Sequence, residues 1–164
     1  MTLDALNRMN REEFAHALGW VFEQSPWVAK RTWPLRPFAS VEDLHQAMVA
    51  QVASATPEEQ IELIRAHPDL GERARMSSAS LGEQTGAGLD RLSPEEFEML
   101  HRLNAAYREK FGFPFIYAVK GSTKQEILGA LQERLAGDAA RELPIALAQI
   151  YRIAQFRLED TIHA

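Results

Sequence analysis

The stretch SPEEFEMLHRLNAAYREKFG, residues 93–112, carries the signals that begin and end an α-helix. Ser93 is a typical N-cap, Pro94 suits the first helical position, and Glu96 stands three residues after the cap, where it can complete a capping box. Gly112 at the other end suits the backbone turn that ends many helices. The sequence therefore predicts a helix across this stretch.

The same helical signals recur on both sides of it. Five further segments have an N-cap residue, apolar residues at helical spacing, or both. They are 10–24, 40–54, 56–67, 122–137 and 138–162. Segment 25–38 contains three prolines and can form at most a short helix and a turn. Only FIYAV, residues 115–119, is typical of extended chain, and one short strand makes no sheet.

These patterns predict an all-α fold class, with a single irregular multi-helix bundle forming one domain over residues 1–164. Two stretches interrupt the helices. Residues 67–92 are long for a connection between helices, and long loops in compact domains tend to be functional or disordered, so we expect a long functional loop there. We expect one short extended segment within residues 112–121.

Composition and charge exclude several classes of protein. The 164 residues suit one hydrophobic core, and the net charge of −5 argues against nonspecific nucleic-acid binding. Without cysteine, disulfides, thiolate nucleophiles and cysteine-ligated metals are excluded. No apolar run is long enough to span a bilayer, so no membrane partner is expected. The first residues lack the apolar core of a secretion signal, and DTIHA at the end is not a peroxisomal tripeptide, so we expect a cytoplasmic location.

His67 stands where the preceding helix must end, because Pro68 disfavours helical angles in the residue before it. Two interpretations are open. The imidazole can cap the last carbonyl groups of the helix, where positive charge is favoured. Alternatively, it is an acid or hydrogen-bond donor with a pKa near the working pH. No His-Glu-x-x-His or similar spacing is present, so no metal site is expected.

Other polar positions also have two interpretations. Glu83 and Gln84, in SLGEQTGAG, belong either to a solvated loop or to a surface close to a ligand. Arg157 lies at the edge of an apolar stripe on the last helix, so its side chain reaches either solvent or a pocket in which its planar fork holds a carboxylate. Asn104 interrupts another apolar stripe, and a structural hydrogen bond is its expected role.

The stretch KFGFPFIYAVKG, residues 110–121, ends one helix and continues as extended chain. Extended backbone leaves N–H groups without partners unless a strand or a ligand accepts them. The amides of Phe115 to Ala118 can therefore face a small polar ligand. Alternatively, the stretch is an apolar connector that packs Phe113, Phe115 and Ile116 into the core, and both interpretations can hold together.

Four motifs, taken in order along the chain, resemble the 2-oxo-4-hydroxy-4-carboxy-5-ureidoimidazoline (OHCU) decarboxylase family of urate breakdown. They are HPDLG, SLGEQTGAGLDRLSPEEF, LNAAYREKFGFPFI and IYRIAQFRLEDTI. The similarity covers about residues 8–162 and is strongest from His67 to Gly121. The combination of motifs at these spacings is specific, whereas any one of them alone is weak.

The resemblance implies an all-helical, homodimeric lyase that needs no metal or organic cofactor. Its partner is a small anionic substrate, OHCU, which it decarboxylates to (S)-allantoin. Carried onto this chain, the catalytic residues are His67 and Glu83. The substrate-binding positions that the resemblance implies are Pro68, Ser80, Gln84, Phe115, Ile116 and Arg157.

Two other functions stay open from the sequence. One is a family member that acts on a related ureido or imidazoline acid. The other is a non-enzymatic helical binding domain that uses its apolar face for a partner. A binding domain would tolerate replacement of His67 and Glu83, whereas the enzyme would not.

Overall fold

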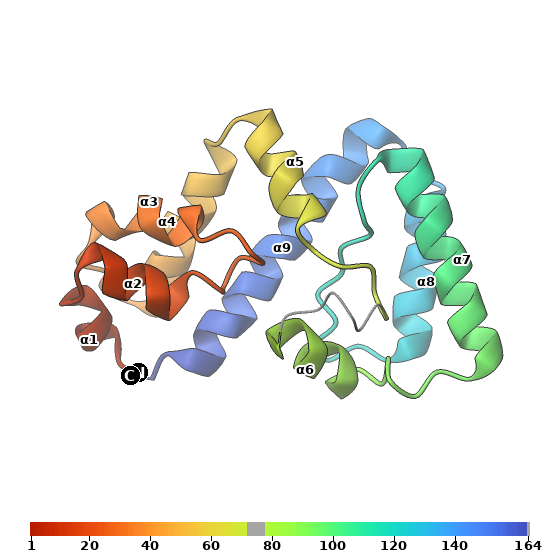
Figure 1. Ribbon diagram of the computed structural model, residues 1–164, viewed down its shortest axis with the longest axis horizontal. Coiled ribbons are helices and arrows are strands. Elements are labelled where there is room, and N and C mark those ends of the chain that lie inside the picture. Colours follow the sequence, from red (N-terminus) through yellow and green to blue (C-terminus); the bar gives the residue numbers. More distant parts are fainter. Residues whose placement is uncertain (72–77, 164) are drawn as a thin grey trace. The chain divides into compact units, whose positions relative to one another are not determined.

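The computed structural model describes residues 1–71 and 78–163, and these residues are all-α, as predicted (Figure 1). Within them no strand forms, and the β pairing consists of one isolated bridge between Thr2 and His163. The helices are α1 (Leu3–Asn7), α2 (Arg11–Leu18), α3 (Trp27–Thr32), α4 (Val41–Ala53), α5 (Pro57–Arg65), α6 (Ser78–Gly86), α7 (Pro94–Phe111), α8 (Lys124–Leu135) and α9 (Ala139–Thr161), with a 3-10 turn η1 (Trp33–Leu35) after α3.

The chain divides into two compact units. The first comprises Met1–Ala66 together with the chain from Tyr151 onward, and the second comprises His67–Ile150. Helix α9 contributes its last part to the first unit and its earlier part to the second. The single domain over residues 1–164 stays a prediction.

The first unit is held together by helix packing and by its chain ends. Helix α2 packs against α3, and α3 packs against α4, which buries Phe14, Leu44 and Met48 completely. The amide of His163 donates to the carbonyl of Met1 over 2.8 Å, so the first and last described residues lie together (Figure 1). The last part of α9 is thereby fixed to the start of the chain.

The second unit is built around α7 and α8, which pack against each other. The expected capping box forms at the start of α7: Ser93 accepts from the amide of Glu96, and the Glu96 carboxylate accepts from the amide of Ser93. Gly112 ends the helix with φ of 80°, a left-handed conformation that glycine adopts without strain. The chain then runs from Pro114 to Val119 without helix, bend or turn, so the predicted extended segment is confirmed.

The loop predicted over residues 67–92 is wrong for its middle part, because Ser78–Gly86 forms α6. The helix ends in a Schellman motif: the amide of Leu89 donates to the Gln84 carbonyl, and the amide of Gly88 donates to the Thr85 carbonyl. Gly88 has φ of 83°, as that motif requires. The two glycines, two serines and one threonine of α6 have low helix propensity, so burial and this C-terminal cap outweigh their local preference.

Candidate functional site

Most of the predicted site residues lie in the second of the two units. Arg157 lies in the first unit, and the other predicted residues lie in the second. The second-unit residues that are buried are His67, Pro68, Ser80, Gln84, Phe115 and Ile116, and Glu83 is half-buried. Polar side chains are mostly exposed in folded proteins, so a buried histidine together with two buried polar side chains in one compact unit needs an explanation beyond apolar packing.

His67 begins the second unit, directly after the last turn of α5, and it is 6 % exposed. The turn that follows it is attached to α7 at two points. The Asp69 carboxylate pairs with the Arg108 guanidinium at 3.0 Å, and the Leu70 carbonyl accepts from Asn104 Nδ2 at 2.9 Å. The expected structural hydrogen bond of Asn104 is thus confirmed, and it fixes the backbone that carries the histidine.

The same turn is attached to α6 through Gln84. The amide of Gly71 donates to Gln84 Oε1 over 2.8 Å. Because a backbone N–H can only donate, this bond determines which end of the Gln84 amide is the oxygen. The Nε2 end has no hydrogen-bond partner among the described residues. Gln84 therefore connects the His67 turn to α6.

Glu83 lies on α6, one residue before Gln84, and not in an irregular loop as predicted. Its position on a helix that is bonded to the His67 turn places both predicted catalytic residues on connected elements. Ser80, one helical turn before Gln84, is 6 % exposed and lies on the buried side of the same helix. The predicted loop at Ser80, Glu83 and Gln84 is wrong, because all three residues lie on α6.

A cavity of about 280 Å³ lies beside this turn. Its lining residues are Asp69, Leu70, Gly71, Phe97, His101 and Asn104. None of the residues predicted to bind substrate is among these lining residues, so the cavity does not coincide with the predicted site.

The extended segment buries its side chains, and some of its amides are unpaired. Phe115 and Ile116 are 1 % and 3 % exposed, which confirms their packing into the core. Within the described part of the chain, the amides of Phe115, Ile116 and Tyr117 have no hydrogen-bond partner. Buried backbone N–H groups are paired in the great majority of cases, so these three are candidates for ligand contact.

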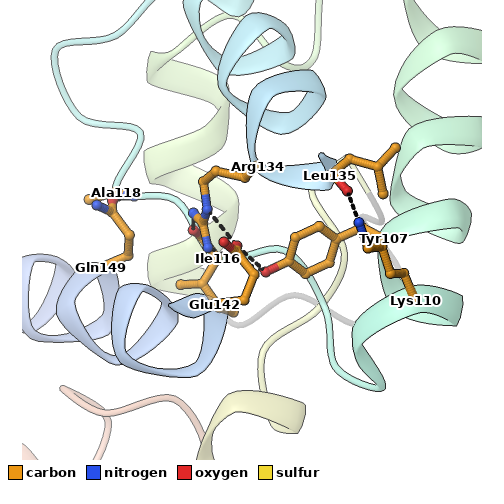
Figure 2. A network of polar contacts seen from close by, with 8 residues as sticks. All are labelled: Tyr107, Lys110, Ile116, Ala118, Arg134, Leu135, Glu142 and Gln149. Atoms are coloured by element: carbon orange, nitrogen blue, oxygen red, sulfur yellow. Dashed lines mark hydrogen bonds and ion pairs between the residues drawn. The ribbon is translucent and has the colours of Figure 1, made fainter. Parts of the chain in front are cut away.

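The amide of Ala118 is not available, in contrast to the sequence-based expectation. It donates to Gln149 Oε1, on α9, over 2.9 Å. The carbonyl of Ile116 is also occupied, because it accepts from Arg134 Nη1, on α8, over 2.6 Å. Figure 2 shows both contacts reaching the segment from the two helices.

A buried polar network supports the Arg134 contact (Figure 2). Glu142 Oε1 accepts from Arg134 Nε at 2.8 Å and from the Tyr107 hydroxyl at 2.5 Å. Burial, together with the hydrogen bond to Glu142, raises the pKa of Tyr107 above its ordinary value, so the hydroxyl keeps its proton and donates. The Arg134 guanidinium also lies 4.5 Å from the centre of the Phe115 ring.

Arg134, Glu142 and Gln149 were not among the residues predicted from the sequence. A signal for Glu142 was present, because it lies four residues before Ala146 on a buried stripe of α9 that continues to Ile150. A carboxylate that continues an apolar stripe needs a partner inside the protein. No comparable signal marked Gln149, which is half-buried on the same helix.

Arg157 does not reach solvent, since its side chain is 3 % exposed. Its Nη1 donates to the carbonyls of Trp20 and Val21 at 3.3 and 3.2 Å, and its Nη2 lies 3.4 Å from Glu23 Oε2. The interpretation in which Arg157 reaches solvent is therefore wrong, and its role in binding a substrate carboxylate stays a prediction. Glu23, which is 1 % exposed, was not predicted from the sequence.

Residues 1–71 and 78–163 contain no group of three or more His, Asp or Glu side chains placed to hold a metal ion. Over the same residues, no helix has the length and apolar character needed to cross a membrane.

Comparison with known proteins identifies the family. The sequence profile of OHCU decarboxylase matches residues 7–159. The chain belongs to the OHCU decarboxylase family. A family member from Halalkalicoccus jeotgali, named 2-oxo-4-hydroxy-4-carboxy-5-ureidoimidazoline decarboxylase, is 48 % identical over 160 residues, which cover 98 % of this chain and 91 % of that protein. The resemblance stated from the motifs is thereby confirmed.

Longer relatives contain the family sequence as one part. The uric acid degradation bifunctional protein PucL of Bacillus subtilis is 48 % identical over 161 residues, 98 % of this chain but 33 % of PucL. A crystal structure of (S)-allantoin synthase superposes with a TM-score of 0.82 at 32 % identity, over 99 % of this chain and 54 % of that one. A crystal structure of OHCU decarboxylase in the presence of (S)-allantoin gives a TM-score of 0.70 at 27 % identity, over 91 % and 96 % of the two chains.

Proposed function

We propose that this member of the OHCU decarboxylase family catalyses the decarboxylation of 2-oxo-4-hydroxy-4-carboxy-5-ureidoimidazoline to (S)-allantoin in urate degradation. The Halalkalicoccus relative, which this chain matches over 91 % of its length, is named for that reaction. The structural observation that carries the proposal is the 2.8 Å bond from Gly71 to Gln84, because it joins the turn after His67 to the helix that bears Glu83.

The reaction requires fixed donors that stabilise developing charge, and it does not require an added group that accepts electrons. The substrate carries a hydroxyl and a carboxylate on one carbon, beside a ring C=N carbon. When the C–C bond to the carboxylate breaks, carbon dioxide leaves and the bonding electrons flow into the C=N group. The enzyme has to hold the carboxylate out of the ring plane and stabilise the developing charge with fixed donors. We therefore propose a reaction without metal or organic cofactor.

The proposed roles follow from residue type and position. His67 hydrogen-bonds the hydroxyl and leaving-carboxylate region, and Glu83 helps to place or move its proton. Gln84 donates through Nε2 to the ring or the ureido group, and the segment that contains Phe115 and Ile116 contacts the same groups through its backbone. Arg157 offsets negative charge on the substrate.

The wall of the proposed pocket includes two further residues, Pro68 and Ser80, which are both buried. A proton then reaches the ureido-bearing carbon from one face only, and this sets the S configuration. We also propose that the protein acts as a homodimer in the cytoplasm, and light scattering at assay concentration tests the dimer.

Circular dichroism during urate breakdown tests the proposed function. Urate oxidase and hydroxyisourate hydrolase generate OHCU from urate, this protein is added, and optical activity is followed as allantoin forms. We expect a lasting (S)-allantoin signal. His67→Ala should slow its formation by about 100-fold or more, the usual range for loss of an acid–base group. His16→Ala, which replaces an exposed histidine on α2, is the matched control.

Each other outcome has a defined meaning. Decay of OHCU at the unaided rate, with no residual optical activity, would show that the substrate is a different acid. A wild-type signal that persists in both His67→Ala and Glu83→Gln would refute the proposed roles of these residues. If the protein forms no allantoin, and its biological activity survives both His67→Ala and Glu83→Gln, it is a non-enzymatic binding domain.

A further inference from the structure

The two edges of the extended segment are used differently. In extended backbone, the N–H and C=O groups of one residue point to one edge, and those of the next residue point to the opposite edge. Ile116 and Ala118 therefore share an edge, and Phe115 and Tyr117 share the other. The contacts from α8 and α9 both fall on the Ile116–Ala118 edge. The amides of Phe115 and Tyr117 have no partner among the residues that the structure describes, and neither has the Ile116 amide, but the Ile116–Ala118 edge is the one that the two helices hold.

The Arg134 contact is stiff because the guanidinium is held on several sides. Its side chain is 13 % exposed, and Nε is bonded to Glu142, whose side chain is 2 % exposed. A guanidinium is planar, so fixing Nε on a buried carboxylate also fixes the direction in which Nη1 donates. That direction is toward the Ile116 carbonyl, 2.6 Å away. Contact with the Phe115 ring, 4.5 Å from the guanidinium carbon, limits its remaining freedom.

The Gln149 contact adds a second point two residues further along. Gln149 Oε1 accepts from the Ala118 amide at 2.9 Å and comes from α9, whereas Arg134 comes from α8. One contact would let the segment pivot or slide. Two contacts from different helices, one to a carbonyl and one to an amide on the same edge, fix both its register and its rotation about its own axis.

Burial of apolar surface does not explain this arrangement. Phe115 and Ile116 are already buried, and apolar packing is tolerant of small shifts along the chain. A buried ion pair such as Arg134–Glu142 is also weak evidence for stability, because apolar residues of similar volume commonly do as well. What the polar contacts supply beyond packing is a single orientation of the backbone groups.

We propose that Arg134 and Gln149 are positioning residues for the decarboxylation. By occupying the Ile116 carbonyl and the Ala118 amide, they turn the amides of Phe115 and Tyr117 toward the substrate and hold them at a fixed register. This inference rests on the proposed function, and it assigns a task to two residues that do not themselves contact substrate.

Four variants test it. Gln149→Met keeps the length of the side chain but removes the acceptor, and Gln149→Glu restores an acceptor at the same reach. Arg134→Lys keeps a positive charge for Glu142 but cannot bond Glu142 and the Ile116 carbonyl in one fixed geometry. Lys110→Met is the matched control, because Lys110 Nζ donates to the Leu135 carbonyl and joins α7 to the end of α8 without touching the segment (Figure 2).

Two readouts are measured for each variant at a temperature at which all are folded. The first is the pair kcat and KM for (S)-allantoin formation from enzymatically generated OHCU. The second is deuterium uptake by a peptide covering residues 113–119, which needs no substrate. We expect Gln149→Met and Arg134→Lys to lower kcat by about ten- to a hundredfold, with KM less affected, since a small misplacement can cost that much. Their peptide should take up deuterium about tenfold faster, whereas Gln149→Glu and Lys110→Met should match the wild type.

The outcomes separate this inference from the proposed function. If the wild type is active and the kcat values of Gln149→Met and Arg134→Lys both lie within about twofold of the wild-type kcat, the positioning role alone is overturned. Unchanged deuterium uptake in those two variants would also overturn it, because the segment would then be held by packing. A wild type that forms no allantoin would refute the proposed function and, with it, the catalytic role of these contacts.

Discussion

Replacing Tyr107 with phenylalanine should destabilise the protein by an amount that the structure allows us to estimate. The side chain is fully buried, and its hydroxyl donates to Glu142 Oε1 over 2.5 Å. A hydrogen bond to a charged group contributes about 1.5–3 kcal/mol. Phenylalanine keeps the ring contacts, and Glu142 keeps its bond to Arg134 at 2.8 Å, so no buried acceptor is left unpaired. We therefore expect a loss in the lower half of that range, about 1.5–2 kcal/mol, at pH 7.

The same hydroxyl makes stability depend on alkaline pH. Burial, with the Glu142 hydrogen bond, raises the folded-state pKa of Tyr107 above its ordinary value of 10.0. Above pH 10 the unfolded chain loses this proton while the folded protein keeps it, so the free energy of unfolding falls as pH rises. This one group should contribute a decrease of about 1.4 kcal/mol between pH 9 and pH 11. Tyr107→Phe should lack that component.

Urea unfolding followed by far-ultraviolet circular dichroism, from pH 7 to pH 11, measures both effects. Tyr151→Phe is the matched control, because burial raises the pKa of Tyr151 but no hydrogen bond of its hydroxyl is found among the described residues. It should cost little at pH 7 and still reduce the alkaline slope. A difference between wild type and Tyr107→Phe below about 0.5 kcal/mol at pH 7, or one that stays constant from pH 9 to pH 11, would refute the reasoning.

Three further changes have expected outcomes. Gly71→Ala should cost about 1–2 kcal/mol by urea unfolding, because the residue has φ of 83° and an added Cβ would lie 3.0 Å from a leucine side chain; an unchanged midpoint would contradict this. The Arg31 hydrogen bond lowers the pKa of Glu59 from 4.5 to about 2, so its contribution is present above pH 4.5 and lost as pH falls toward 2. Glu59→Gln should therefore show a shallower acid-induced fall of the urea midpoint, and an identical fall would count against the pair. Glu23→Gln removes the carboxylate that faces buried Arg157 and should cost about 3 kcal/mol in unfolding free energy, whereas a loss below about 1 kcal/mol would mean that the backbone carbonyls suffice.

The helices that could be predicted are those whose ends are specified locally. Residues 56–59 and 93–96 both contain an N-cap, a proline and a glutamate, and both form the expected capping box. Gly112 ends α7 in the left-handed conformation that its position indicated. These signals lie within one turn of the feature that they determine, so a single sequence is enough to read them.

Helix α6 could not be predicted in the same way, because its glycines, serines and threonine have low helix propensity and no start signal was recognised in it. Its end was readable in principle, since Gly88 occupies the left-handed position of a Schellman motif. The other part of what stabilises the helix is not local. Gln84 is bonded to Gly71, 13 residues earlier in the chain, and periodicity carries no information about such a contact.

In the candidate site, too, the sequence indicates which residue types matter but not which partners they contact. Arg157 and Gln84 were candidate binding residues from the sequence, and the structure buries both side chains. The sequence did not indicate that Glu23 would face Arg157, 134 residues away in the chain, or that Gln149 would occupy the Ala118 amide, 31 residues away. Pairings of this kind follow from how helices pack, and no pattern within one helix specifies them.

The proposed reaction, without a cofactor, must obtain its rate from placement, and this gives a reason why the contacts around the candidate site join distant parts of the chain. In the proposed reaction the substrate accepts its own electrons, so the protein contributes donors whose directions do not change as charge develops. Backbone amides meet that requirement only if the backbone itself is fixed. Gln84 fixes the turn after His67, and Arg134 and Gln149 fix the segment after Pro114, each through a bond of 2.6–2.9 Å. The parts of this unit that the sequence left irregular are therefore the parts that long-range polar contacts hold in place.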